Sequence, residues 1–379
     1  ELPEDLVTGV DNWYATLSPM GTESEGLVIR IMEGRAKKVR GNPLYPINQG
    51  SHSVRAEASL QALYHPERIS NPMLRIGTRG DGQYRNIDWN EALDILKGEL
   101  QNLPNGSNLL SITNPLSGSL AHVIKTFSEQ FGSRHTSFDP LDETTFNSTV
   151  KNLFNQDRLP TFDLKNCEFL LSFGADFLST WLSPVQFAKG FGEFRQGANR
   201  TRGTFVQIDS RFSMSAANAD EWIPILPGME GALALSIAQV IISEELVPKS
   251  RIQSMHTGSA LSELQNALAP FAPELIVSEL GIPELHHDKP AEIIKSLARA
   301  FAKHGSKSIA LGGGSSAAHT NGLFNLTAIY ALNFLVGSVG QTGGILFNPK
   351  APVETLAHTS TSATTAQWIE IKNSIDNGD

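Results

Sequence analysis

Two short runs, one polar and one of glycines, could bind a ligand, and each directly follows an expected strand. Asp209-Ser210-Arg211 follows the strand pattern of residues 204–208, and Gly312-Gly313-Gly314 follows that of residues 307–311. A carboxylate at a strand end can accept hydrogen bonds from sugar hydroxyls or guanine amines, and glycines let backbone amides approach a phosphate. The plain alternatives are that Asp209 caps a helix or pairs with Arg211, and that the glycines allow a strand to pack tightly on a helix.

Metal ligation has little support among the remaining residues. The single cysteine, Cys167, lies in an apolar run, and one thiol cannot form a cysteine-only zinc or iron–sulfur site. The pair His286-His287 beside Asp288 lacks further ligands at suitable spacing, so we expect a solvated loop there. The sequence contains no H-E-x-x-H, G-x-S-x-G or P-loop motif.

Composition indicates a globular protein of more than one domain. The 379 residues exceed one typical domain, and 40% hydrophobic with 18% charged residues exclude a disordered chain. Acidic residues outnumber basic ones by 39 to 30, which argues against nucleic acid as a partner. No run approaches the roughly 20 apolar residues that span a bilayer, so we expect no direct membrane span and any membrane association through partners.

Strand and helix patterns alternate along most of the chain and must position the polar runs. Strand patterns cover residues 109–112, 169–173, 204–208 and 307–311, and helical patterns cover residues 120–131, 231–243, 321–336 and 367–375. Asp88 and Glu91 form a capping box at the start of a further helix. This alternation predicts an α/β fold with largely parallel sheets, in which the loops after the strands share one edge.

The first 75 residues follow a different pattern, which predicts a small β-rich lobe. Residues 27–31 and 35–40 flank Glu33-Gly34 and predict a β-hairpin. We therefore divide the chain into a β-rich lobe at 1–75, an α/β core at 76–350, and a linker and helix at 351–379. We expect that last segment to lead into a missing continuation.

Several short motifs, taken together, match one protein family. They are Gly41-Asn42-Pro43 with Pro46, Asn48 and Gly50; residues 63–69; residues 87–93; residues 208–211 with Ala219, Asp220 and Pro227-Gly228; and Gly312-Gly313-Gly314 with Gly337, Gly340, Gly343 and Gly344. In these runs the chain resembles the molybdopterin oxidoreductase (dimethyl sulfoxide reductase-like) family. The resemblance implies that family's fold, with a small β-rich lobe before layered α/β domains. It also implies that Asp209-Ser210-Arg211 and the glycine triplet are vestigial pterin-site positions.

The family's iron–sulfur segment is altered in this chain. Its pattern is C-x2-C-x3-C with a fourth cysteine about 27 residues later, and the matching positions here are Ser18, Gly21, Glu25 and Ser53. Iron–sulfur clusters need thiolate ligands, which hydroxyl, glycine and carboxylate groups do not replace. The resemblance therefore implies a degenerate cluster site whose scaffold is kept, and we expect these four residues to lie close together around a filled space.

The molybdenum ligand and the pterin space are the other family features to place. The resemblance implies that family enzymes supply the ligand from a loop that reads His135 to Glu143 here, and this loop holds no cysteine. Ser137, Asp139 and Asp142 are the residues that could serve in principle, but acidic loop residues are usually only solvated, so we expect no metal ligand here. Without a pterin, we expect bulky side chains to fill part of the space near Asp209, since a dry void loses packing energy. The candidates are Phe177, Trp181, Phe187 and Phe212.

Within the family, the opening residues 2–6 and 14–16 are most similar to the molybdopterin-like/iron–sulfur large subunit of bacterial alternative complex III, a quinol-oxidising membrane assembly. The resemblance implies a structural subunit or domain with no cofactor, no metal and no catalytic residue of its own. It implies iron–sulfur clusters and haem in partner subunits or a continuing domain. The implied partners are a ferredoxin-like iron–sulfur domain, a multihaem cytochrome and a quinol-binding membrane subunit, on the extracytoplasmic (periplasmic) side.

Other functions stay open at this point. One is an active molybdopterin oxidoreductase that lacks only its first iron–sulfur cluster. Another is the large subunit of an NADH:quinone oxidoreductase, although that subunit usually keeps its cysteine clusters and this chain has one cysteine. A soluble nucleotide-binding module is the remaining alternative.

Overall fold

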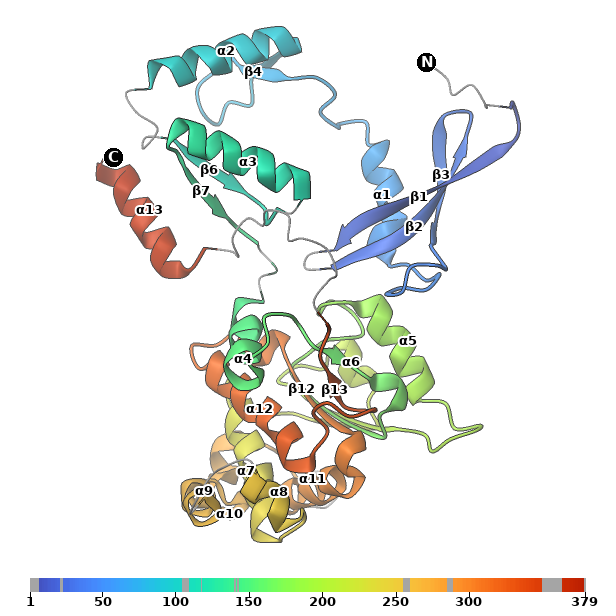
Figure 1. Cartoon of the computed structure of the whole chain (residues 1–379), viewed down its shortest axis with the longest axis vertical. Coiled ribbons are helices and arrows are strands. Elements are labelled where there is room, and N and C mark those ends of the chain that lie inside the picture. Colours follow the sequence, from blue (N-terminus) through green and yellow to red (C-terminus); the bar gives the residue numbers. More distant parts are fainter. Residues whose placement is uncertain are drawn as a thin grey trace. The chain divides into compact units, whose positions relative to one another are not determined.

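The computed structural model describes residues 7–20, 23–103, 109–116, 118–139, 141, 143–254, 260–284, 289–349 and 363–377. The chain forms two compact units, each described by itself below (Figure 1). Unit 1 comprises Glu1–Arg35, Val39–Ser53 and Glu143–Lys350, and unit 2 comprises Ala36–Lys38, Val54–Asp142 and Ala351–Asp379. The divisions expected after residues 75 and 350 stay predictions.

A small antiparallel hairpin opens the chain, and its sheet has the order β1-β2-β3. The strands are β1 (Asp11–Met20), β2 (Glu23–Met32) and β3 (Arg35–Gly41). Glu33 and Gly34 have φ angles of 50° and 76°, the left-handed values that a two-residue hairpin turn requires. The predicted hairpin is confirmed, and β1 adds a strand that the sequence patterns did not indicate.

The main sheet of unit 1 is parallel, with the order β11-β10-β9-β12. Its strands are β9 (Phe169–Phe173), β10 (Thr204–Ile208), β11 (Glu221–Ile223) and β12 (Ser308–Gly312). All five residues of β9 and of β12 are buried, as expected for parallel strands covered on both faces. Because β10 and β12 flank β9, the strand order reverses there and the loops after β9 and β12 diverge, which is where α/β sheets place ligands.

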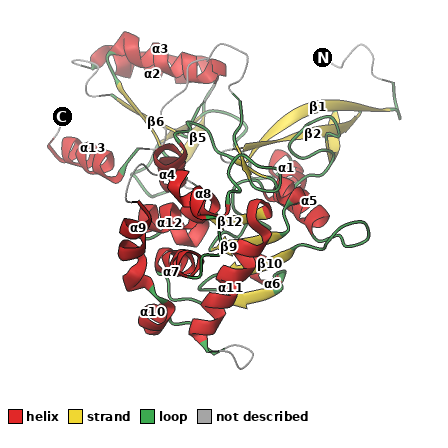
Figure 2. Ribbon diagram, turned by 60° about the horizontal axis from the view of Figure 1, so that its bottom comes forward, coloured by secondary structure: helices red, strands yellow, loops and turns green. Residues whose placement is uncertain are grey.

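Helices enclose this sheet (Figure 2). They are α4 (Thr144–Phe154), α5 (Pro184–Phe194), α6 (Met214–Ala217), α7 (Glu230–Ser243), α8 (Lys249–Ser254), α9 (Ala260–Leu268), α10 (Pro273–Leu280), α11 (Pro290–His304) and α12 (Gly322–Val336). The short strands β8 (Thr161–Phe162) and β13 (Ile345–Leu346) pair antiparallel. Most residues of α7 and α12 are buried, so these two helices form the centre of the helical layer.

Helix α12 also closes one edge of the main sheet. The buried side-chain amide of Asn333 accepts a hydrogen bond from the Ala310 N–H and donates one to the Ala310 carbonyl, both at 2.9 Å. Because β12 is the last strand on this side, the Asn333 amide gives the outward backbone N–H and C=O of Ala310 the partners that a further strand would supply.

Unit 2 contains a parallel βαβ unit made of β6 (Leu110–Thr113), α3 (Gly118–Phe131) and β7 (Arg134–Ser137). Its other elements are α1 (Val54–Leu63), the pair β4 (Met73–Arg75) and β5 (Tyr84–Asn86), α2 (Trp89–Asn102) and α13 (Thr365–Asn377). The predicted cap of α2 is present, since the Asp88 carboxylate accepts the Glu91 N–H at 2.8 Å. Glu370 of α13 pairs with Arg134 of β7 at 3.0 Å.

The α/β fold class with largely parallel sheets and a small N-terminal β sheet is confirmed. One local prediction is wrong: residues 135–137, expected in a loop, lie in β7 and pair with β6. Within the described part of the chain, no helix is long and apolar enough to cross a membrane.

Candidate functional site

Three of the four degenerate cluster positions can be placed, and they lie together in unit 1. Ser18 on β1 pairs directly with Glu25 on β2. The Glu25 carboxylate is 5% exposed and accepts the Ser53 N–H at 2.8 Å, across 28 residues of sequence. Gly21 lies outside the described residues. The hairpin and the following loop therefore keep the proximity that the sequence spacing led us to expect.

A buried asparagine, Asn48, holds that loop against β2. The Asn48 side chain accepts the Gly26 N–H at 3.0 Å and donates to the Gly26 carbonyl at 2.8 Å, and it also donates to the Ser51 carbonyl. The Tyr45 ring packs so closely on Gly26 that a side chain at Gly26 would overlap it. These contacts fix the position of the loop against β2.

The donor set at these positions does not fit an iron–sulfur cluster. Ser18, Glu25 and Ser53 present hydroxyl and carboxylate oxygens, whereas the irons of a cluster require thiolates. The one thiol, Cys167, is buried directly before β9, and burial raises its pKa to about 12. Such a thiol stays protonated at neutral pH, and one thiol alone cannot supply the ligands of a cluster.

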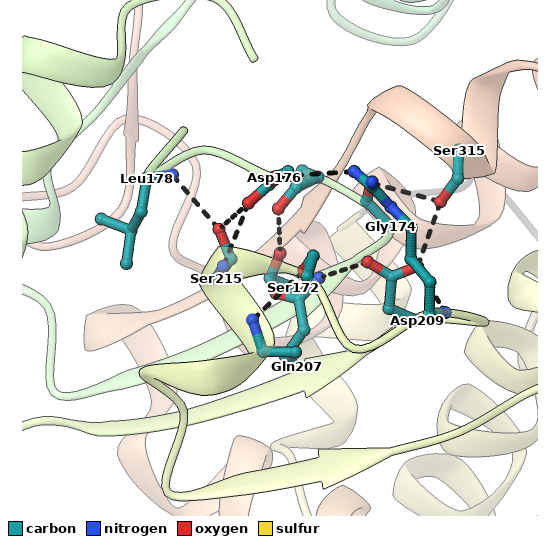
Figure 3. Close-up of polar contacts among 12 residues, drawn as sticks. Ser172, Gly174, Asp176, Leu178, Gln207, Asp209, Ser215 and Ser315 are labelled. Carbon is teal, nitrogen blue, oxygen red and sulfur yellow. Dashed lines mark hydrogen bonds and ion pairs between the residues drawn. The ribbon is translucent and has the colours of Figure 1, made fainter. Parts of the chain in front are cut away.

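The second site lies at the carboxyl ends of the main strands, where each loop brings a polar side chain (Figure 3). Asp209, directly after β10, is fully buried. Its carboxylate accepts hydrogen bonds from the Gln207 amide and the Arg211 N–H, both at 3.3 Å, and from the Ser315 hydroxyl at 3.5 Å. Asp209 therefore joins the loops after β10 and β12. The sequence suggested an ion pair between Asp209 and Arg211; in the structure the Asp209 carboxylate accepts the backbone N–H of Arg211 instead.

Asp176, from the loop after β9, forms the other half of this network. One carboxylate oxygen accepts both the N–H and the hydroxyl of Ser215, at 3.0 and 2.8 Å, and the other contacts the Arg211 guanidinium at 3.4 Å. The Ser215 hydroxyl accepts the Leu178 N–H at 3.2 Å. Sequence reasoning missed Asp176, because a lone aspartate after a strand has no distinguishing neighbours.

Other protein atoms fill the space beside each glycine of the triplet. A methyl group at Gly312 would meet Leu326 and Ile329 of α12 at 3.0 Å, one at Gly313 would overlap the Trp181 indole at 2.4 Å, and one at Gly314 would lie 2.7 Å from the Gly174 carbonyl. Each glycine is thus required by a close approach of protein atoms. The packing of a strand on a helix that the sequence suggested applies to Gly312 against α12, whereas Gly313 and Gly314 pack against the loop after β9.

The backbone amides beside the triplet are also engaged. The Gly313 N–H donates to the Ser316 hydroxyl at 3.0 Å, and the Ser315 N–H donates to the Gly174 carbonyl at 3.2 Å. With these donors used and Trp181 against Gly313, the run does not fit the pyrophosphate of a pterin dinucleotide. The carboxylates of Asp176 and Asp209 add negative potential, which further disfavours phosphate.

Aromatic side chains pack next to this edge, as expected for three of the four candidates. Phe177, Trp181 and Phe187 are buried, and the Trp181 and Phe187 rings stack at 5.7 Å between centroids. Phe212 differs: it is 63% exposed and contacts the Trp222 ring edge-on. The reason is its position after the Asp209 turn, which directs it away from the core cluster.

A third buried carboxyl, Glu230, begins α7 in the segment that follows β11. Its Oε2 accepts the Asn325 amide at 3.3 Å, while its Oε1 has no hydrogen-bond partner within the described residues. Burial raises the pKa of Glu230, and the nearby charge of Asp209 adds to the effect, while His319 opposes it. Sequence reasoning missed Glu230. The acidic residue stands directly before the apolar run Gly231 to Ile242, and that position could have indicated a buried carboxyl.

The described residues hold no group of three or more metal-ligating side chains. His286, His287, Asp288 and Asp142 lie outside them, and Ser137 is buried in β7. A cleft of about 1020 Å³ in unit 1 lies between the loop 46–49, the segment 157–165 and α5. None of the carboxylates or glycines described above lines it.

Comparisons with known proteins show the family. A model of the molybdopterin oxidoreductase family matches residues 68–378. The chain is 27% identical to the menaquinone reductase molybdopterin-binding-like subunit of Nitratidesulfovibrio vulgaris, over 91% of this chain and 47% of that protein. It is 27% identical to the molybdopterin-containing subunit of arsenate respiratory reductase of a Shewanella species, over 93% of this chain and 43% of that protein. The chain therefore spans less than half the length of these relatives.

A solved structure supports the fold. Acetylene hydratase from Pelobacter acetylenicus superposes with a TM-score of 0.62 at 20% identity, covering 86% of this chain and 42% of that one.

Proposed function

Because this chain belongs to the molybdopterin oxidoreductase family, we propose that it serves as a cofactor-free structural subunit or domain of a membrane-associated, quinol-oxidising complex of the alternative complex III type. The observation that carries the proposal is the glycine run after β12. The Gly313 and Ser315 N–H groups are bonded to protein atoms, and the space beside the three glycines is filled by α12, Trp181 and Gly174. The oxygen ligands at the degenerate cluster positions support the same conclusion.

The relatives support a role beside other subunits. The menaquinone reductase relative is named a molybdopterin-binding-like subunit, and the arsenate and thiosulfate reductase relatives are also named as subunits. We propose that redox centres sit in partners or in a continuing domain. These are a ferredoxin-like iron–sulfur domain, a multihaem cytochrome and a quinol-binding membrane subunit, with this chain on the periplasmic side.

Metal and pterin analysis of the purified complex tests the proposal. The complex is isolated through a tag on this chain, and molybdenum and tungsten are measured by mass spectrometry while released pterin is measured by fluorescence after oxidation. We expect less than one tenth of an equivalent of either per chain, with iron and haem present in the copurified subunits. A molybdenum-loaded reductase of the same family, processed in parallel, controls for loss of metal.

The opposite outcome identifies the alternative function. Stoichiometric molybdenum or tungsten with a pterin dinucleotide would make the protein an active oxidoreductase that lacks only its first cluster. This alternative is supported by the related arsenate and thiosulfate reductase subunits, which are named as molybdopterin-containing.

A further inference from the structure

The N-terminal sheet ends in an edge strand, β1, most of which lacks the usual protection against pairing with a further strand. Among the described residues, β1 pairs only with β2, in continuous register from Asp11 to Met20. Within the described residues, the other side of this ten-residue strand therefore presents the unpaired backbone groups of every second residue. Natural proteins guard such edges with short strands, bulges, charged side chains or proline; β1 has one such guard, Pro19 near its end, and none between Asn12 and Ser18.

Proline identifies which backbone groups face outward. Pro19 has no N–H, and within a paired strand it fits only where the nitrogen points away from the partner. Because outward and inward groups alternate along an antiparallel strand, the N–H groups of Leu17, Ala15 and Trp13 also point outward. These three amides make up the receptive part of the edge.

Three large side chains in the middle of β1 are apolar and exposed, and the Arg40 guanidinium of β3 lies over the Trp13 ring, 4.8 Å from its centroid. Trp13 is 40%, Tyr14 is 50% and Leu17 is 57% exposed. The one charge on the strand, Asp11 at its far end, is paired with Arg30 at 2.6 Å. From Asn12 to Ser18 the strand carries no charge.

The opposite edge strand gives an internal contrast. β3 carries Arg35, Lys37, Lys38 and Arg40 within seven residues, the charge pattern that keeps edges from pairing. One sheet thus has one charged edge and one apolar, unguarded edge. Chance exposure of single apolar residues does not account for that difference.

We propose that an extended strand of a partner subunit pairs with the outer edge of β1 and adds a fourth strand to this sheet. Main-chain hydrogen bonds to the amides of residues 13, 15 and 17 fix the register, and the exposed Trp13, Tyr14 and Leu17 call for aliphatic or aromatic side chains on the incoming strand. The occupant is an apolar, extended protein segment, because only a strand satisfies a row of alternating donors and acceptors. The proposal rests on the proposed function, since it takes the partner to be another subunit of the complex.

Hydrogen exchange on the wild-type protein tests the pairing directly. Residue-resolved exchange of segment 10–20 is compared between the intact complex and the isolated chain. We expect the amides of Trp13, Ala15 and Leu17 to exchange at least about tenfold more slowly in the complex, while Tyr14 and Thr16, already bonded to β2, change little. Equal exchange of the three outward amides in both samples would overturn the proposal.

Two variants at Ala15 distinguish binding through the backbone of the edge from binding through its side chains. Ala15→Pro removes an outward N–H, whereas Ala15→Val keeps it and retains an apolar side chain. We expect the yield of copurified partners to fall about tenfold or more with Ala15→Pro and to stay within about twofold with Ala15→Val. The isolated variants should keep melting temperatures within about 4 °C of wild type, because proline is tolerated at outward positions of edge strands.

The possible outcomes distinguish this proposal from the one it rests on. If partners copurify normally with Ala15→Pro, the edge is not the contact, and the structural role of the chain is unaffected. If the isolated chain forms dimers that Ala15→Pro abolishes, a second copy is the occupant and the partner-strand proposal is wrong. Should Ala15→Pro fail to fold, the exchange experiment on the wild type still decides the question.

Discussion

Glu230 couples the stability of unit 1 to pH. Burial raises the pKa of its carboxyl above the ordinary value of 4.5, so the group takes up a proton on folding over part of the pH range. A raised folded-state pKa contributes stability that is fully present below the unfolded pKa. That contribution is lost as the pH rises from there through the folded-state pKa.

We expect Glu230→Gln to flatten the pH dependence of unfolding above about pH 4.5 and to be at least as stable as wild type at pH 8. The glutamine carbonyl can still accept the Asn325 amide, and no ionisation opposes burial. Denaturant midpoints between pH 5 and pH 8 measure the effect. Glu284→Gln, at an exposed position of unit 1, is the matched control and should follow the wild-type curve. Parallel curves for Glu230→Gln and wild type would contradict this account.

At the scale of elements, the loops after β9 and β12 meet through glycine. Gly174 has a φ of 66°, and a methyl group there would lie 2.3 Å from the Ser315 hydroxyl and 2.7 Å from the Ser316 nitrogen. We expect Gly174→Ala to lower the free energy of unfolding by about 2–4 kcal/mol, from backbone strain and overpacking combined. Denaturant titration provides the measurement.

Gly192→Ala on α5 is the control for that substitution. Nothing lies within 4 Å of the added methyl group, and its backbone is helical. Alanine there should leave stability unchanged or raise it by about 1 kcal/mol. If Gly174→Ala behaves in the same way as this control, the two loops are not held together as described.

The elements differ in how well the sequence predicts them. Residues 169–173 and 204–208 are predicted to the residue, because buried parallel strands are short, continuous apolar runs. β7 reads Arg-His-Thr-Ser, with no apolar residue, and it becomes a strand only by pairing with β6. β1 combines serine, threonine and proline with exposed apolar residues, so no burial pattern marks it.

The candidate site is predictable only in part for a related reason. Asp209 and the glycine triplet stand directly behind recognisable strands, and the sequence locates them. Their roles depend on Trp181 and Gly174, which approach from other loops and leave no mark in the local sequence. Asp176 and Glu230 likewise gain their meaning only from burial in the fold.

For the whole molecule, the helices differ in how deeply they are packed. None of the residues of α2 is buried, and its apolar stripe of Trp89, Leu93 and Leu96 is more than half exposed, whereas ten residues are buried in each of α7 and α12. We expect backbone amides of α2 to exchange at least about a hundredfold faster than those of α7 and α12 in the isolated chain. Mass-spectrometric hydrogen exchange measures this, with α12 as the reference. Equal protection would mean that α2 is covered in solution.

The two unlike edges of the N-terminal sheet set a limit on stoichiometry. A strand that pairs with β1 uses up the apolar edge, while the cations of β3 repel a second strand on the other side. Under the proposed pairing, the sheet accepts one added strand only. We therefore expect one-to-one assemblies that close and do not grow into fibres, even though the β1 edge is long.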